Sequence, residues 1–204
     1  MIQTVLTPPP SVRPLDLFAS AGTALFRVGD SATSLFKLRE GLVKLSVVTP
    51  QGSEHILGFY GAGDVLGSAS LSSPQRHLAE AIAITDVRYD TVSPEHTHHL
   101  VIDLEAQLRR SQESLALASA PVIVRLAATL LDLNERFGKA QCQTHCRLAL
   151  PLRHEDYAAA IHATRVSVTT AFAALRQADI VLGQRSDYLI DAPRLRQLTQ
   201  TWEL

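Results

Sequence analysis

The sequence predicts an α+β protein with a β-rich first part, a long helix and a C-terminal winged helix-turn-helix. Three observations support this fold class. Glycine turns recur every 11 or 12 residues in the first part, an apolar heptad row follows, and two short helices precede a hairpin near the end. The 204 residues suffice for one large domain or two small ones, and we set the divisions at residues 1–103, 104–137 and 138–204.

The composition excludes several classes of protein. Hydrophobic residues make up 46% and charged residues 19%, with a net charge of -1, which argues against disorder and against a uniformly basic nucleic-acid-binding chain. No apolar run reaches the ~18 residues of a membrane helix, so we expect no membrane partner. Two cysteines and no visible export signal predict a cytoplasmic location.

The charge is distributed unevenly along the chain. Residues 1–135 carry 10 Lys/Arg against 14 Asp/Glu, whereas residues 136–204 carry 9 against 6. Lys139 is the one lysine of the second group, and the other cations are arginines. The forked guanidinium of arginine suits phosphates and guanine edges.

The first part is predicted to form short strands separated by turns. Leu45 and Val47 alternate with Lys44 and Ser46, which is the period of a half-buried strand. Strands at this spacing are typical of a β-sandwich or barrel. The turn glycines are Gly29, Gly41, Gly52 and Gly63. The expected strands cover residues 35–38, 42–48, 55–60, 80–84 and 86–92.

A long helical stretch is expected to follow. Ser93, Pro94 and Glu95 are typical of a helix start, and the apolar pattern continues to Phe137. A continuous helix over residues 104–137 would run ~50 Å, too long to be buried against one small sandwich. Pro121 would either kink or break it.

We therefore predict that this helix forms a dimer, with packing on its own domain as the alternative. The predicted interface residues are Leu104, Leu108, Ser111, Leu115, Ala118 and Val122.

The third region has the pattern of a helix-turn-helix. We expect a helix over residues 156–161, a tight turn at His162, a cap at Thr164 and a second helix over residues 165–178. Histidine tolerates the positive φ that such a turn often needs. The small or apolar residues expected where the helices cross are Ala158, Ile161, Val168 and Leu175. A hairpin over residues 180–190 would form the wing.

The second helix carries exposed side chains suited to a DNA groove. Arg165 is the candidate guanine reader, and Ser, Thr and Val neighbours suit base edges, phosphates and thymine methyls. The alternative is an ordinary helical hairpin in a core. The candidate DNA-binding residues are Arg153, His154, Thr164, Arg165, Val166, Ser167, Thr169, Thr170, Gln184, Arg185 and Ser186.

Four motifs, in this order, give the chain a resemblance to a known family over about residues 20–191. They are GDVLG at 63–67, RLAATLLDL at 125–133, RHEDYA at 153–158 and ATRVSV at 163–168. The chain resembles the cyclic-AMP-receptor and fumarate–nitrate-regulator (CRP/FNR) transcription factors. The resemblance implies a β-roll sensor resembling a cyclic-nucleotide-binding jelly roll, a dimerisation helix, a two-fold double-stranded DNA site and contact with RNA polymerase as an activator.

The nucleotide cassette implied by the resemblance is degenerate here. Ser68 stands where the ribose-binding Glu is expected, and the phosphate-binding Arg-Ser pair falls on His77 and Leu78. Arg76 lies one place early, either as a replacement cation or as a solvated loop residue. The positions that meet the adenine become Arg110 and Ser111, and Gly67 of the glycine turn is counted in the same degenerate pocket. A cyclic phosphate would lack its partners, so we expect no cofactor and no dependence on cyclic AMP.

The resemblance also places limits on the reading helix and on other cofactors. The usual Glu and second Arg of that helix are Val166 and Thr170, so a different or relaxed DNA consensus is expected. No cysteine precedes Cys142, which excludes a four-thiolate iron–sulfur site within the chain. The candidate haem ligands are His55 and His77.

Two further clusters are compared with metal sites. Cys142, His145 and Cys146, with His154, offer zinc-type ligands, but a second ligand pair is missing and an ordinary linker is the favoured interpretation. The residues Glu95, His96, His98 and His99 are interpreted as a solvated helix start. No nucleophile, oriented base or metal set is visible, so we predict a regulator and not an enzyme. A regulator gated by cyclic AMP or another small effector is the alternative.

Overall fold

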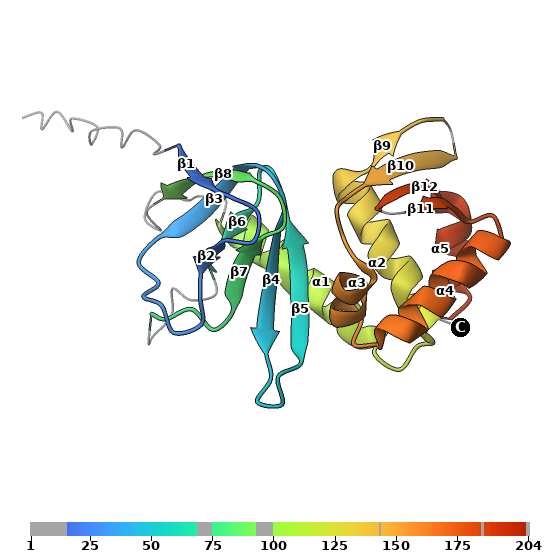
Figure 1. Ribbon diagram of the computed structural model, residues 1–204, viewed down its shortest axis with the longest axis horizontal. Coiled ribbons are helices and arrows are strands. Elements are labelled where there is room, and N and C mark those ends of the chain that lie inside the picture. Colours follow the sequence, from blue (N-terminus) through green and yellow to red (C-terminus); the bar gives the residue numbers. More distant parts are fainter. Residues whose placement is uncertain (1–15, 69–74, 93–99, 143, 185, 203–204) are drawn as a thin grey trace, which may run out of the picture.

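The structure is a computed structural model that describes residues 16–68, 75–92, 100–142, 144–184 and 186–202. Two lobes lie side by side (Figure 1). The first is built from β1–β8, and the second from α2–α5 with β9–β12. Helix α1 passes behind the strands of the first lobe toward the second (Figure 1). No helix of the described part is long and apolar enough to cross a membrane.

The first lobe contains two four-stranded antiparallel sheets. Their strand orders are β1-β8-β3-β6 and β2-β7-β4-β5, so strands distant in sequence are neighbours in each sheet. This confirms the β-rich sensor-like fold. The strands are β1 Leu17–Ala19, β2 Ala24–Phe26, β3 Leu35–Glu40, β4 Val43–Val48, β5 Glu54–Tyr60, β6 Val65–Leu66, β7 Glu80–Ala83 and β8 Val87–Val92.

The simple alternation predicted for residues 44–47 is wrong in detail. Ser46 is fully buried, whereas Leu45 and Val47 are half-buried. The cause is a register shift in the β4–β5 pair, where Leu45 faces Gly58 but Ser46 faces Ile56. The extra residue of β5, Leu57, is left 55% exposed, as expected at a β-bulge.

The predicted long helix is divided into two helices. α1 spans Leu100–Ala116 and α2 spans Val122–Phe137. Pro121 lies at the start of α2, where it needs no backbone N–H, and its carbonyl accepts from Val124 and Arg125. Proline therefore breaks the helix, and a continuous ~50 Å rod is not formed. The predicted start at residues 93–95 lies outside the described residues.

α2 is part of the second lobe, because the other elements of that lobe pack around it. Its elements are β9 Lys139–Ala140, β10 His145–Ala149, α3 His154–Ala160, α4 Arg165–Gln177, β11 Val181–Gln184, β12 Asp187–Asp191 and α5 Ala192–Gln200. β9–β12 form one antiparallel sheet, in the order β11-β12-β10-β9. Leu126, Leu130 and Leu133 of α2 are fully buried in this core. The expected division at residue 138 thus separates residues that share a core.

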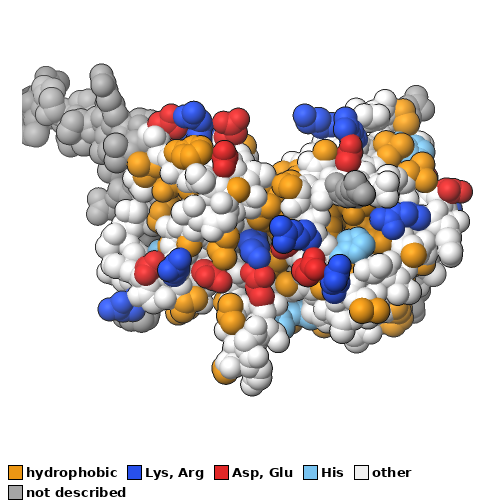
Figure 2. Space-filling view, viewed as in Figure 1, with side chains coloured by type: hydrophobic (Ala, Val, Ile, Leu, Met, Phe, Trp, Pro, Cys, Tyr) orange, Lys and Arg blue, Asp and Glu red, His pale blue; other side chains and the backbone are white. Residues whose placement is uncertain are grey.

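That core continues into the first lobe. Leu42, Ile56 and Phe59, from or beside β4 and β5, belong to the same buried cluster as the leucines of α2. The first lobe has a second, separate core around Phe26, Leu38 and Val43. The junction between lobes is therefore apolar inside, and charged side chains gather over it on the face shown in Figure 2.

Candidate nucleic-acid interface

Helix α3 begins at His154, two residues before the predicted start at residue 156. The backbone N–H of Arg153 donates to the Asp156 carboxylate at 2.8 Å, and Glu155 and Asp156 occupy the first turn. Negative side chains are favourable there because the helix dipole is positive at its N-terminus. Tyr157 and Ala158 are buried against the rest of the lobe, which leaves the Arg153 side chain exposed.

The turn between α3 and α4 has the expected backbone. His162 has φ of 53°, and the N–H of Ala163 donates to the Ala158 carbonyl at 2.9 Å. Thr164 then caps α4, because its hydroxyl accepts from the Ser167 N–H at 3.1 Å. These contacts confirm the predicted helix-turn-helix.

One face of α4 is buried and the opposite face is open. Val168, Phe172 and Leu175 are fully buried, and with Ala158 and Ile161 they fix the crossing of the two helices. The exposed side chains of the first two turns are Arg165, Val166, Thr169 and Thr170. This face matches the predicted reading surface.

Arg165 is held in place by a neighbouring acid. Its Nε lies 3.0 Å from the Glu155 carboxylate, and the two side chains are 70% and 57% exposed. An ion pair this exposed contributes little to stability and is easily exchanged for another partner. Arg165 is thus positioned at the surface without being committed to the fold.

The polar neighbours of Arg165 are more constrained than the sequence suggests. The hydroxyls of Thr169 and Thr170 donate to carbonyls one turn back, at 2.9 and 3.1 Å. His154 stacks on Phe172 with ring centroids 4.8 Å apart, and its Nδ1 lies 2.9 Å from the Thr169 hydroxyl. Burial, with Arg176 and Arg165 nearby, lowers the pKa of His154. His154 therefore sits at the site as a neutral ring near pH 7, with its charge disfavoured.

The wing is the hairpin of β11 and β12. Gln184 is exposed on it, whereas the hydroxyl of Ser186 donates to the Leu152 carbonyl at 2.9 Å and so anchors the hairpin. Arg185 lies outside the described residues. Sequence reasoning missed the two-pronged pair of Arg147 with Asp187, at 2.8 and 2.6 Å, which braces β10 against β12. No local motif signals a pair 40 residues apart.

The cassette positions of the sensor lobe are occupied by packed side chains. His77 is buried and its ring stacks on Phe26 with centroids 3.8 Å apart. Burial lowers the pKa of His77. Ser68, after Gly67 with φ of 92°, is also buried, and neither its hydroxyl nor His77 Nδ1 has a hydrogen-bond partner within the described residues.

The other cassette positions, Arg76, Leu78, Arg110 and Ser111, have surroundings that differ from one another. Arg76 donates to the Gly29 carbonyl at 2.6 Å and ties two loops together, while Leu78 is 68% exposed. On α1, Arg110 lies over the Tyr60 ring at 5.7 Å and Ser111 is exposed. Within the described part of the chain, Arg76 and Arg110 thus contact Gly29 and Tyr60 and not the buried Ser68 and His77.

The predicted dimer residues form an exposed stripe on α1. Leu104, Leu108 and Leu115 are 40%, 60% and 72% exposed, and Ser111 is exposed beside them. Ala118 is also exposed but lies in the turn after α1, which ends at Ala116. Val122 differs, because it starts α2 and packs on the core that the two lobes share. The break at Pro121 explains why it leaves the row.

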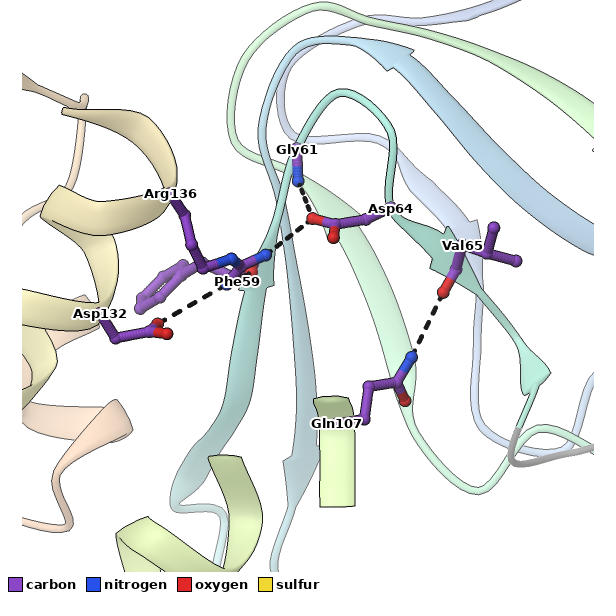
Figure 3. Close-up of polar contacts among 7 residues, drawn as sticks. All are labelled: Phe59, Gly61, Asp64, Val65, Gln107, Asp132 and Arg136. Carbon is purple, nitrogen blue, oxygen red and sulfur yellow. Dashed lines mark hydrogen bonds and ion pairs between the residues drawn. The ribbon is translucent and has the colours of Figure 1, made fainter. Parts of the chain in front are cut away.

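Polar contacts hold the first lobe against the second lobe. Arg136 of α2 reaches across to the Asp64 carboxylate at 2.7 Å and to the Phe59 carbonyl at 2.7 Å (Figure 3). Asp64 also accepts from the Gly61 N–H at 2.7 Å, so it orders the β5–β6 turn as well. Lys44 bridges Glu54 at 2.8 Å and lies 3.6 Å from Asp156 of α3.

A histidine pair completes this junction. His55 of β5 and His162 of the helix-turn-helix turn have their Nδ1 atoms 2.6 Å apart, so one ring donates and the other accepts. Burial, His55 and Arg125 together lower the pKa of His162. His55 therefore contacts the turn of the helix-turn-helix. The two histidines are 107 residues apart, so residue spacing in the sequence could not predict this contact.

The cysteine-histidine cluster lies on the β9–β10 turn. Cys142 Sγ is 3.7 Å from His145 Nδ1, and Cys146 is half-buried on β10. Hydrogen bonds from the backbone N–H groups of Thr144 and His145 lower the pKa of the Cys142 thiol to about 7. Across the described residues no three ligands are grouped to hold a metal. The histidines expected at 96, 98 and 99 lie outside those residues.

Comparisons with known proteins agree with this architecture. The cyclic nucleotide-binding domain family matches residues 17–101, and the Crp-like helix-turn-helix domain family matches residues 124–198. The CRP-like cAMP-activated global transcriptional regulator of Mycobacterium tuberculosis is 30% identical over 164 residues, covering 74% of this chain and 73% of that protein. The fumarate and nitrate reduction regulatory protein of Yersinia pestis is 29% identical over 129 residues, 58% of this chain and about half (52%) of that protein.

Solved structures show the same fold. FixK2 from Bradyrhizobium japonicum aligns with a TM-score of 0.78 at 20% identity, covering 91% of this chain and 96% of that one. A CRP-family transcriptional regulator from Thermus thermophilus aligns with a TM-score of 0.75 at 23% identity, covering 90% and 96%. The relatives are regulators and not enzymes, and with the two matched domain families they show that this chain belongs to the CRP/FNR family of transcription regulators.

Proposed function

We propose that the protein is a homodimer that binds two-fold DNA sites in a sequence-specific way without cyclic AMP. Activation by contact with RNA polymerase is part of the proposal and rests on the family resemblance. The observation that carries the proposal is the open face of α4, where Arg165 and Val166 stand exposed above a fully buried opposite face. Such a helix places its first residues in a major groove.

The dimer is supported by the stripe on α1. Three leucines, each at least 40% exposed, lie on one face of α1 together with Ser111, and the exposed Ala118 follows in the next turn. A second copy of α1 would remove this apolar surface from water. Two reading heads held by one dimer would then meet two half-sites about one helical turn apart.

Independence from cyclic AMP is supported by the packing of the cassette. His77 stacks on Phe26 where the phosphate-binding pair is expected, and the one nearby arginine, Arg76, is bonded to Gly29. A cyclic phosphate placed there would be buried without a cation, which is costly.

Gating by a small effector is the alternative function. It is favoured by the Ser68 hydroxyl and His77 Nδ1, which are buried without partners among the described residues and would accept or donate a hydrogen bond to a bound molecule. Cyclic AMP is one such effector, and a smaller neutral molecule is another.

Fluorescence anisotropy on a labelled two-fold duplex tests both functions. We expect tight binding over a scrambled duplex, with affinity that falls as salt rises and does not change when cyclic AMP is added. Binding that appears only with cyclic AMP would select the alternative. Equal binding to both duplexes would contradict sequence-specific recognition.

The dimer has its own test. Leu108→Lys puts a charge into the proposed seam, so we expect sedimentation to report a monomer and DNA affinity to fall at least ~10-fold. The matched control is Val48→Lys, since Val48 is 54% exposed at the end of β4 and outside the seam. A Leu108→Lys protein that remains dimeric would contradict this interface.

A further inference from the structure

A cleft lies between the two lobes, apart from the cassette residues Ser68 and His77. Its walls come from β5, from the second half of α1, from α2 and from the end of α3. Its volume is about 330 Å³, within the range of small-molecule sites. Its lining residues include Leu57, Phe59, Leu117, Ala118 and Ala128, which form apolar walls.

Three arginines line the same cleft, against two acids. Arg136 is committed, because it is bonded to Asp64 and to the Phe59 carbonyl. Arg110 and Arg125 have no carboxylate within 4.0 Å in the part of the chain that the structure describes. The acids Glu113 and Asp132 are paired within their own helices, with Arg109 and Arg136.

Arg125 has an incomplete set of acceptors. One of its terminal nitrogens donates to the Ile161 carbonyl at 2.6 Å, but its Nε is buried and has no acceptor among the described residues. A buried N–H without an acceptor is costly and is usually met by water or by a ligand. Arg110 contacts the Tyr60 ring face and hydrogen-bonds the Tyr60 hydroxyl, which leaves its remaining N–H donors able to bind an oxyanion.

We infer that this cleft binds a small amphipathic anion, with its carboxylate or sulfonate at Arg110 and Arg125 and its apolar body against Leu57, Leu117 and Ala128. Guanidinium groups bind carboxylates in two-pronged geometry. The apolar walls disfavour ligands that are polar over their whole surface, because such ligands would lose water there without gaining hydrogen bonds. The site shares Arg110 with the cassette positions but does not include Ser68, Arg76 or His77. It depends on both lobes, so a bound anion stabilises the arrangement described here.

The aromatic sulfonate 8-anilinonaphthalene-1-sulfonate is a suitable probe, because its fluorescence rises in an apolar site. With the full chain we expect saturable binding and a rise in melting temperature with probe concentration. Octanoate should displace the probe and octan-1-ol should not, because the two differ chiefly in charge.

Two variants and one control locate the site. Arg110→Gln should weaken probe binding about 10-fold, because it removes one charged donor. Ala128→Phe, which fills the cleft from α2, should weaken it at least as much. The control Arg88→Gln should change nothing, since Arg88 is 54% exposed and pairs with Asp16 in the first lobe, outside the cleft lining. Melting curves of each variant, recorded without probe, confirm that it is folded.

Equal probe affinity in the wild type, Arg110→Gln and Ala128→Phe would overturn the inference, because the probe would then bind elsewhere. Displacement by octan-1-ol as strong as by octanoate would overturn the claim that the ligand is an anion. DNA binding by the same samples is measured in parallel. A protein that binds DNA but not the probe would contradict the cleft inference and leave the proposed function standing.

Discussion

Arg165 is the residue on which the proposed sequence-specific recognition depends most. It stands exposed at the first turn of α4, paired with Glu155 at 3.0 Å. Arg165→Ala should cost about 1–3 kcal/mol of binding free energy and relax one base position, whereas Arg153→Ala should weaken binding to all sequences alike. Anisotropy against duplexes with single base changes measures this, with Arg196→Ala as a control on α5. A uniform loss in Arg165→Ala would assign it to the phosphates.

Gly41 and Gly52 are a matched pair of turn glycines, with φ of 93° and 84°. A Cβ at Gly41 would overlap the Asp86 carbonyl, whereas one at Gly52 meets nothing within 4 Å. Gly52→Ala should therefore cost about 1 kcal/mol for the backbone alone, and Gly41→Ala at least about 3 kcal/mol. Urea denaturation measures both. Equal losses would show that the first lobe yields at residue 41.

At this scale the sequence predicted residues whose roles are local. The positive φ of His162, the Thr164 cap and the burial of Val168 follow from neighbouring residues, so they were predictable. The burial of Ser46 was not, because a bulge against β5 sets it. The anchoring of Ser186 to Leu152 also depends on a partner distant in sequence.

The contact of β5 with the helix-turn-helix turn is sensitive to pH. The pKa of His162 is lowered by burial, His55 and Arg125, and those of His77 and His154 are lowered chiefly by burial. Their neutral forms are favoured in the folded state, so stability is complete above the unfolded pKa of ~6.5 and is lost as pH falls through the lower folded values.

We expect the melting temperature to fall as the pH is lowered from about 7.5 to about 5.5, across the unfolded histidine pKa. His162→Asn should flatten this dependence while keeping the turn, because asparagine tolerates positive φ. Facing this pair are Arg125 from α2 and Glu54, Glu155 and Arg165 around the neighbouring cleft. His145→Asn, on β10, is the control. A slope unchanged in His162→Asn would assign the pH dependence to other groups.

Among the elements, helices and wing could be predicted and their grouping could not. Heptad spacing correctly marked apolar rows on α1 and α2, but the same spacing fits a dimer seam and a core. Only the break at Pro121 separates them, placing Leu108 in solvent and Leu130 in the core that the two lobes share. Sequence left the kink and the break open, because proline starts helices as readily as it ends them.

Arg136 joins the two lobes. Its side chain is 17% exposed and bonds to Asp64 and the Phe59 carbonyl (Figure 3). Arg136→Gln should cost about 2 kcal/mol and make the lobes unfold in two steps. Calorimetry measures this, and Arg109→Gln is the exposed control. One unshifted transition in Arg136→Gln would show that the apolar junction suffices.

The shared core also has a consequence for how the chain is made. Leu42, Ile56 and Phe59 leave the ribosome long before Leu126 and Leu130, yet they belong to one cluster. Until α2 arrives, the nascent first lobe carries a bare apolar patch that a chaperone would recognise. A fragment that begins at α2 would lack Leu42, Ile56 and Phe59, and its own side of this core would be exposed. During synthesis, residues 42–60 thus remain uncovered until α2 has been made. The folding of each half of the molecule depends on the other half.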